Sequence, residues 1–487
     1  MPSLAGLFFW MNRKIENINK ITITKPLKLD CGKTIKNFHL AHETYGKLNE
    51  NKDNAILVFH ALTGDQFVTG TNPVTNKEGW WVTAVGPGKA IDTDKYFVIC
   101  ANVIGGCMGS LGPKDLNPEN NQPYGLDFPV ITIKDFPLAY ETYGNLSKNK
   151  DNAILVFHAL TGDQFVTGKN PVTNKEGWWV TAVGPGKAID TDKYFVICAN
   201  VIGGCMGSLG PKDTNPENNQ PYGLDFPVIT IKDMVKAQES LLEHLDIKKL
   251  LCATGGSMGG MQLLQFCTTF PDKAFSAIPI ACSSSHSAQN IALNELARQA
   301  IMADPVWDNG KYVSKNVQPK NGLAVARMVG HISYLSEKGM QEKFGRKLQE
   351  KADYEFSFNA DFQVESYLRH QGYAFVERFD ANSILYITRA MDYFDLSKQY
   401  KGGLVEAFKN QDTKFLVISF SSDWLYTTKE NKDIVIALNA SGADVSYSEI
   451  VTDKGHDSFL LNEPEFLKTL KGFIDSMYEK FKNEKRI

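Results

Sequence analysis

The chain has 487 residues, of which 43% are hydrophobic and 22% charged, and its formal net charge at pH 7 is −3. This composition is typical of a soluble globular protein, and the length allows two or three domains. The nearly balanced charge gives no reason to expect nucleic acid or a membrane as a partner. Eight cysteines are scattered without CxxC pairs or Cys/His metal spacing, which predicts buried free thiols, no metal site and a cytoplasmic location.

The N-terminal stretch MPSLAGLFFWMNRKIE contains a short apolar run ahead of its first basic residue. A secretory signal has a positive region before its apolar segment and a small-residue cleavage site, and this stretch has neither. The run is also too short to span a bilayer. We expect residues 1–19 to be a disordered extension and residues 20–37 to hold the first strand.

A block of 98 residues occurs twice. Residues 38–135 (copy one) recur as residues 136–233 (copy two) with seven mismatches, which indicates a tandem duplication or an error in assembling the gene, because solenoid repeats diverge further and occur at least three times. Only copy two is followed at once by a helical pattern, MVKAQESLLEHLDI. Parallel strands need such a crossover. We therefore expect copy two to supply the working core and copy one to be surplus.

One serine lies between two pairs of glycines in the stretch LLCATGGSMGGMQ, residues 250–262. An apolar run typical of a buried strand precedes it and an apolar pattern that fits a helix follows, so Ser257 matches the nucleophile elbow G-x-S-x-G. The glycines give room to a strained backbone, and the helix N-terminus favours a developing oxyanion. A glycine-rich turn with an incidental serine is the alternative.

Strand and helix patterns alternate through the rest of the chain, except at residues 286–400, where helical patterns occur without clear strands. This order predicts a doubly wound, mostly parallel α/β sheet that a helical lid interrupts after the sixth strand. The expected core is divided between residues 136–285 and 401–487, with the lid at 286–400.

A serine nucleophile needs a base, and the base needs an orienting carboxylate. In an α/β-hydrolase sheet these follow in the order Ser, Asp or Glu, His. Asp423 directly follows a strand pattern, and His456 comes after the last strand and before the final helix. An Asp after a strand is also a common turn residue, and Asp453 is a competing acid at a less suitable position.

Several separated motifs resemble the homoserine O-acyltransferase family of the α/β-hydrolase superfamily. They are HALTGD, GWWVTAVGPGKAIDTDKYFVICANVIGGCMGSLGP, GGSMGGMQ, GLAVARMVGHISYLS, SSDWLY and GHDSFL, in this order. The resemblance runs from about residue 20 to the C-terminus once one copy is set aside. Family members carry the block once, so the duplication is a departure from the pattern.

The resemblance implies a ping-pong acyl transfer in methionine biosynthesis. Ser257, activated by His456 and Asp423, would take the acetyl group of acetyl-CoA and pass it to the γ-hydroxyl of L-homoserine. Acetyl-CoA would be a co-substrate, with no bound cofactor, and the resemblance suggests a homodimer. The family's oxyanion donors map to the backbone N–H groups of Met258 and of Leu160, or of its twin Leu62.

The resemblance also implies how the substrate is held. Arg327 matches the substrate-binding arginine, whose guanidinium suits a carboxylate. Asp457 matches the residue that holds the substrate amine, and Tyr334 matches a tyrosine of the substrate tunnel. Members that use succinyl-CoA tend to carry an arginine after the Trp of the acid motif, whereas this chain has Leu425, which favours acetyl.

Other functions are compatible with the same sequence features. A homoserine O-succinyltransferase or a serine O-acyltransferase would share the motifs, since one methylene gives only about 1–3 kcal/mol of discrimination. A serine esterase or thioesterase would share the triad and differ in admitting water. From another class, an inactive dimerising protein would result if the duplication had destroyed catalysis.

Overall fold

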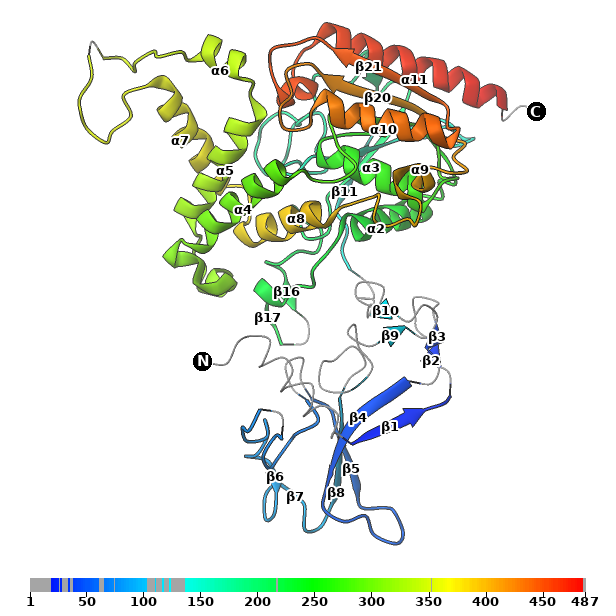
Figure 1. Ribbon diagram of the computed structural model, residues 1–487, viewed down its shortest axis with the longest axis vertical. Helices are drawn as coiled ribbons and strands as arrows, with labels where there is room; N and C mark the ends of the chain where they lie inside the picture. Colours follow the sequence, from blue (N-terminus) through cyan, green and yellow to red (C-terminus); the bar gives the residue numbers. More distant parts are fainter. Residues whose placement is uncertain are drawn as a thin grey trace. The chain divides into compact units, whose positions relative to one another are not determined.

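The computed structural model describes residues 19–25, 27–28, 34–35, 38–60, 65–73, 75–102, 110, 116–117, 122–123, 136–215, 218–351 and 353–484. Contacts divide the chain into two compact units, Met1–Asp135 and Phe136–Ile487 (Figure 1). Most of the expected N-terminal extension and the loop that contains Leu62 lie outside the described residues.

The first unit contains a four-stranded sheet built from the first strand region and copy one. Its order is β1 (Lys20–Ile23), β4 (Phe38–Tyr45), β8 (Phe97–Ala101) and β5 (Ala55–Val58). β1 pairs antiparallel with β4, and β5 lies at the opposite edge, parallel to β8. Three short two-stranded ladders accompany the sheet: β2 (Leu27–Lys28) with β3 (Thr34–Ile35), β6 (Val85–Gly86) with β7 (Ile91–Asp92), and β9 (Leu116–Asn117) with β10 (Gln122–Pro123).

The second unit is built around a seven-stranded sheet, to which copy two contributes the first three strands. The order is β11 (Tyr140–Tyr143), β15 (Phe195–Ala199), β12 (Ala153–Phe157), β18 (Leu250–Gly256), β19 (Ala274–Ile280), β20 (Lys414–Phe420) and β21 (Val445–Ile450). Only β11 pairs antiparallel, with β15. The strands β12, β18 and β19 are buried along their whole length, as expected where helices cover both faces of a parallel sheet. The predicted, mostly parallel α/β sheet is confirmed.

Helices cover both faces of this sheet. One hydrophobic cluster joins the sheet to α2 (Ile231–His244), α3 (Met258–Thr269) and α10 (Thr428–Ser441), and a second joins the opposite face to α11 (Pro464–Glu484). The crossover α2 is capped by residues at the end of copy two, where Thr230 and Asp233 bond reciprocally to each other's backbone N–H. Copy two leads directly into this crossover, whereas copy one would reach it only through 98 further residues, at a cost in loop entropy.

A set of helices lies between β19 and β20 and forms the lid. They are α4 (Ala288–Met302), η3 (Pro305–Lys315), α5 (Lys320–Tyr334), α6 (Glu337–Lys343), α7 (Gln363–Val376), α8 (Ala381–Tyr393) and the short α9 (Gly403–Ala407). In chain order the lid follows the fifth strand of the seven-stranded sheet, so the prediction that it follows the sixth is wrong. The reason is that β1 pairs with β4 in the first unit, which leaves this sheet one strand fewer before the lid.

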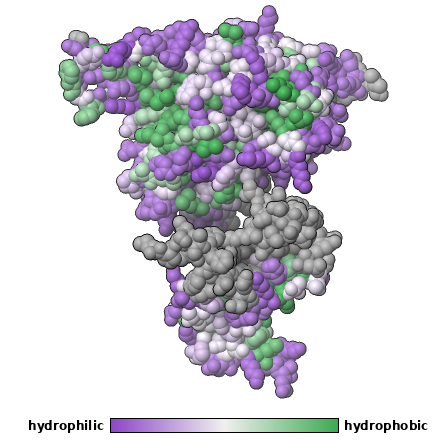
Figure 2. Space-filling model, in the orientation of Figure 1, coloured by the Kyte–Doolittle hydropathy of each residue, from purple (hydrophilic) through white to green (hydrophobic). Residues whose placement is uncertain are grey.

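Identical sequences have different environments in the two copies. In copy two, the β12 residues Leu155 and Phe157 are completely buried against β18 and its neighbours. Their counterparts in copy one, Leu57 and Phe59, are 55% and 82% exposed, because β5 ends its sheet. Hydrophobic surface is therefore left open on the first unit (Figure 2).

Candidate active site

The predicted site residues follow the carboxyl ends of neighbouring strands, which is where ligand sites of open α/β sheets form. Leu160 follows β12, Ser257 follows β18, Asp423 follows β20 and His456 follows β21. Since the carboxyl ends of these parallel strands meet at one edge of the sheet, with only β19 between β18 and β20, the sheet gathers groups that are up to 296 residues apart in the sequence.

Ser257 occupies a sharp turn between β18 and α3. Its φ of 60° and ψ of −127° lie outside the helical and extended regions, a strained conformation that a non-glycine residue adopts only where its surroundings impose it. The serine N–H donates to the Ile280 carbonyl at 3.0 Å, which fixes the turn against β19. The residue is 7% exposed, so its hydroxyl reaches the pocket with little access for bulk water.

Two glycines make this turn possible. A Cβ on Gly255 would lie 2.6 Å from the backbone of Gly259, and a Cβ on Gly259 would lie 2.1 Å from the Phe157 carbonyl oxygen. Both distances are shorter than any tolerable contact, so the elbow requires glycine at both positions. This is the steric reason that the G-x-S-x-G pattern predicts.

Asp423 and His456 form a buried pair. His456 Nδ1 lies 2.7 Å from Asp423 Oδ2, and the other carboxylate oxygen accepts the N–H groups of Leu425 and Tyr426 at 2.9 and 3.0 Å. The competing acid, Asp453, lies 37% exposed and pairs with Lys338 at 3.1 Å. Of the two carboxylates, therefore, Asp423 is the one positioned to orient the imidazole.

The surroundings of His456 favour its protonated form. Burial is the largest influence and lowers the pKa of His456, but the carboxylates of Asp423 and Asp457 outweigh it, so the pKa stands above its ordinary value. An imidazole in this setting readily holds a proton taken from a hydroxyl.

The loop after β12 is fixed by a neutral histidine that the sequence did not single out. The His158 ring contacts the Ala159 carbonyl at 2.8 Å through Nδ1 and accepts the Val201 N–H at 3.1 Å through Nε2. Burial lowers the pKa of His158 to about 4, which keeps the ring neutral. Gln262, from α3, donates to the His158 carbonyl at 3.1 Å. Leu160 therefore lies in a loop that is bonded to the helix following Ser257.

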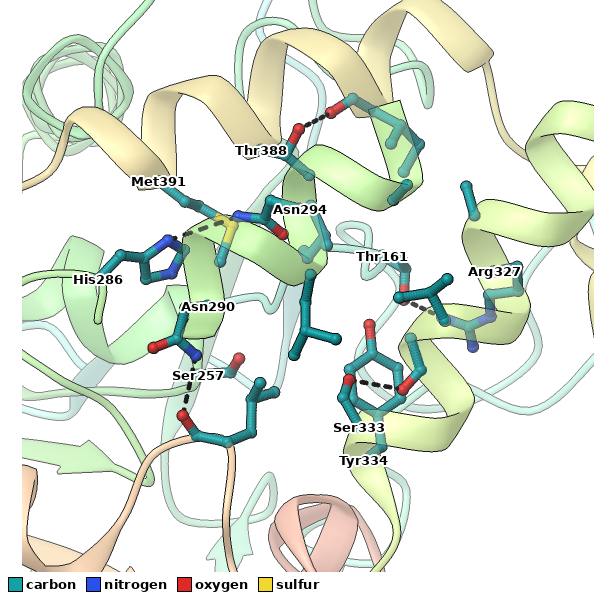
Figure 3. Close-up of a pocket in the computed structure, with 18 of the residues that line it drawn as sticks. Thr161, Ser257, His286, Asn290, Asn294, Arg327, Ser333, Tyr334, Thr388 and Met391 are labelled. Atoms are coloured by element: carbon teal, nitrogen blue, oxygen red, sulfur yellow. Dashed lines mark hydrogen bonds between the residues drawn. The ribbon is translucent and has the colours of Figure 1, made fainter. Parts of the chain in front are cut away.

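A pocket opens above the serine and is walled by the core and the lid. In Figure 3, Arg327 and Tyr334 lie on one side of Ser257, and His286 and Asn290 lie on the other. The predicted residues that line this pocket are Leu160, Ser257, Arg327, Tyr334 and Leu425.

Arg327, from the lid helix α5, presents a half-buried guanidinium to the pocket. Its Nη1 donates to Thr161 Oγ1 at 3.2 Å, and the guanidinium lies over the rings of Phe375 and Tyr334 at 4.8 and 5.7 Å. Among the described residues it forms no ion pair, although its charge acts on the Asp457 carboxylate. A planar guanidinium in this setting can pair with an anionic ligand.

Asp457 adds a carboxylate to the same region. Burial is the largest influence on it and raises the pKa of Asp457, although His456 and Arg327 oppose the rise. Asp457, the residue after His456, thus carries a partly desolvated carboxyl group, which suits a cationic group of a ligand.

A second arginine, Arg378, was not found from the sequence. Its Nη1 donates to the Thr161 carbonyl at 3.1 Å, next to the hydroxyl that Arg327 contacts, and it also lies over Phe375. Burial and then the charge of Arg327 lower the pKa of Arg378. Because Arg378 follows the lid helix α7 outside any recognisable motif, only the tertiary fold reveals its place.

Within the described residues, no group of three or more His, Cys, Asp or Glu side chains is arranged to hold a metal ion. In the same part of the chain, no helix is long and apolar enough to cross a membrane.

Comparisons with known proteins agree on one family. The model of the alpha/beta hydrolase fold family matches residues 152–463. The homoserine O-acetyltransferase of Pelagibacter ubique is 68% identical over 349 residues, which are 72% of this chain and 94% of that protein. Its namesake in Rhodospirillum rubrum is 58% identical over 73% of this chain and 90% of its own length.

Solved structures give the same result. A homoserine O-acetyltransferase from Bacillus anthracis superposes with a TM-score of 0.64 at 28% identity, over 69% of this chain and 91% of that one. Esterase E22 superposes with a TM-score of 0.63, also at 28% identity, over 70% and 95%. With its elbow serine and buried Asp–His pair, the chain belongs to the homoserine O-acetyltransferase family of the α/β-hydrolase fold.

Proposed function

We propose that this chain transfers the acetyl group of acetyl-CoA to the γ-hydroxyl of L-homoserine, giving O-acetyl-L-homoserine and CoA. The observation that carries the proposal is the buried Asp423–His456 hydrogen bond, which follows the same sheet's strand ends as an elbow serine whose pocket also contains Arg327. The names of the most similar relatives support it. In this proposal acetyl-CoA is a co-substrate, and no bound cofactor takes part.

In the first half-reaction, His456 takes the proton of the Ser257 hydroxyl and the serine oxygen attacks the thioester carbonyl. The resulting oxyanion is stabilised by the backbone N–H groups of Leu160 and Met258, the latter at the N-terminus of α3. When the carbon–sulfur bond breaks, His456 returns the proton to the CoA thiolate, and an acetyl ester remains on the serine.

In the second half-reaction the acceptor replaces CoA. Arg327 pairs with the carboxylate of L-homoserine and Asp457 with its ammonium group, while Tyr334 forms part of the wall beside them. His456 then deprotonates the γ-hydroxyl, which attacks the acetyl ester and restores the free serine.

The assay that tests this function measures free CoA and O-acetyl-L-homoserine from the full-length chain with acetyl-CoA, in the presence and absence of L-homoserine. We expect CoA release to depend on homoserine. Release at the same rate without homoserine would favour an esterase-like activity in which water is the acceptor, the second candidate raised by the structural likeness to esterase E22.

Removing the charge of Arg327 is expected to weaken acceptor binding. In Arg327→Met, the KM for L-homoserine should rise about ten- to hundredfold, the cost of losing a charge-assisted contact, with little change in the acylation of the serine by acetyl-CoA. Steady-state kinetics with each substrate varied in turn measures both. The matched control is Arg389→Met on α8, whose side chain is 42% exposed. An unchanged KM would contradict the assignment.

A cation at position 425 is expected to change the acyl preference. Leu425 lines the pocket, so Leu425→Arg should shift the ratio of kcat/KM for succinyl-CoA and acetyl-CoA about tenfold toward succinyl, because a guanidinium pairs with the second carboxylate. Leu425→Met keeps the side chain apolar and of similar size and should leave the ratio unchanged. An unchanged ratio of kcat/KM for succinyl-CoA and acetyl-CoA in Leu425→Arg would contradict the assignment of acyl preference to position 425.

We propose that copy one is surplus to catalysis, since copy two alone contributes strands to the seven-stranded sheet. Deletion of residues 38–135 should leave the specific activity within about threefold of the full-length value, because the pocket residues and the Asp423–His456 pair all lie in the second unit, which has its own hydrophobic core. Limited proteolysis of the full-length chain should cut faster within 47–135 than elsewhere. Loss of activity on deletion, or equal cleavage rates, would show that copy one is needed.

We also propose a cytoplasmic homodimer. The cysteines described as free are all buried thiols, as suits a reducing compartment, and the dimer follows from the family resemblance. Sedimentation analysis of the purified chain tests the oligomeric state.

A further inference from the structure

A second hydrogen-bonded chain includes His286, which lies on the side of the pocket opposite Arg327 (Figure 3). His286, just before the lid helix α4, has its Nδ1 2.9 Å from Asp392 Oδ1 on α8 and its Nε2 2.8 Å from the hydroxyl of Tyr426. The side chains of His286 and Asp392 are 1% and 4% exposed, and Tyr426 is 2% exposed. Three segments distant in sequence therefore meet in one buried polar chain.

The direction of the hydrogen bonds follows from the charge states. Burial raises the pKa of Asp392, but its bonds to His286 and Asn294 and the charge of Arg298, 2.7 Å away, outweigh burial and leave the pKa below its ordinary value. An ionised carboxylate only accepts, so His286 Nδ1 donates to Asp392, and the Tyr426 hydroxyl is the hydrogen-bond partner of its Nε2. The arrangement is a carboxylate, an imidazole and a hydroxyl joined in sequence.

Tyr426 connects this chain to the catalytic pair. Its ring centroid lies 5.2 Å from that of His456, and its backbone N–H donates to Asp423 at 3.0 Å. One residue thus contacts both the acid and the base of the proposed triad. Burial raises the pKa of Tyr426 well above its ordinary value, so the hydroxyl keeps its proton and remains a donor.

The start of α4 holds the neighbouring backbone as well. Asn290 Nδ2 donates to the Leu425 carbonyl at 2.9 Å, and Gln289 Nε2 donates to the Trp424 carbonyl at 3.3 Å. The Asn290 amide oxygen is engaged by the backbone N–H of Ser287, so this side chain is committed to the fold. The first turn of α4 therefore bonds to two successive carbonyls of the loop that carries Asp423.

From these contacts we infer that His286, oriented by Asp392, is a positioning residue: through Tyr426 it fixes the Asp423–His456 pair against the lid. Because His456 acts in both half-reactions, losing this restraint slows acylation and deacylation alike. Arg327 is held through separate contacts with Thr161 and Phe375, so acceptor binding is left intact.

The test compares Tyr426→Phe, His286→Leu, both changes together, and His286→Gln. Acylation of the serine is followed as the burst of p-nitrophenol from p-nitrophenyl acetate, which needs no acceptor, and deacylation as acetyl transfer to L-homoserine. We expect Tyr426→Phe and His286→Leu each to lose about tenfold in both rates with the KM for L-homoserine within twofold, and the double variant to lose no more, because groups that act as a unit are not additive.

His286→Gln keeps one donor and one acceptor and is expected to return to within threefold of the wild-type rates. Tyr447→Phe removes a hydroxyl that bonds to Ser419, away from the pocket, and is the matched control with unchanged rates. If His286→Leu does not fold, the tyrosine and glutamine variants decide. Rates in Tyr426→Phe within twofold of wild type, or a double variant that loses the product of the single losses, would overturn the inference.

The transfer arm rests on the proposed function, but the burst does not. A wild-type chain that acylates without passing the acetyl group to homoserine would contradict the proposed function and leave the inference about His286 open to the burst measurement.

Discussion

Replacing Ser257 with alanine is expected to lower homoserine-dependent CoA release by roughly a millionfold. The remaining rate is the one that substrate binding and the oxyanion donors alone can sustain. The reason is that the elbow turn presents a single hydroxyl to the pocket, and no acyl-enzyme forms without it. Since alanine is smaller than serine, the strained φ of 60° is not made worse by bulk and the fold should persist.

The matched control is Ser240→Ala, which removes an exposed hydroxyl that bonds to the Lys236 carbonyl within α2. Its activity should equal that of the wild type. If Ser257→Ala retained more than about one per cent of the wild-type rate while folded, another group would have to be the nucleophile.

Replacing Asp423 with asparagine is expected to cost about 10⁴-fold in kcat, with a smaller effect on KM. The carboxylate accepts from His456 Nδ1 at 2.7 Å, whereas an amide that turns its NH₂ toward the ring stabilises the wrong tautomer and no imidazolium. Asp453→Asn, in the loop that carries His456, is the control and should leave kcat unchanged. A large loss in Asp453→Asn with little loss in Asp423→Asn would reverse the assignment of the acid.

The same pair of variants has a signature in pH. His456 must be deprotonated to act as a base, so wild-type kcat/KM should fall as the pH drops through its pKa, which Asp423 and Asp457 hold above the ordinary value against burial. Without the Asp423 charge, burial prevails and the pKa falls. The acidic limb of the residual activity in Asp423→Asn should therefore move to lower pH, and in Asp453→Asn it should stay in place.

Local chemistry made the elbow predictable from the sequence. The glycines around Ser257 are required by close backbone contacts at one strand–turn–helix unit, so a short sequence motif is enough to predict them. Asp423 and His456 could be selected because an alternating α/β pattern places strand ends at one edge, and their 2.7 Å contact fits that choice.

Features that depend on long-range pairing were less predictable. Residues 20–23 could pair equally well with copy one or copy two, because the two sequences are nearly identical. The strand pairs with copy one, and the second sheet therefore has one strand fewer before the lid than the sequence predicts. His286 lies just before α4 and Arg378 just after α7, outside any recognisable motif, so their contacts with Tyr426 and Thr161 emerge only when the lid is folded onto the core.

Acetyl transfer through Ser257 is tested by mixing the full-length chain with radiolabelled acetyl-CoA in the absence of acceptor and isolating the protein by rapid gel filtration. We expect one acetyl group per active site, located by mass spectrometry on the peptide that contains Ser257, and its transfer to L-homoserine on addition of the amino acid. Label that never resides on the protein, or that resides on another residue, while O-acetyl-L-homoserine still forms, would contradict the acyl-serine mechanism.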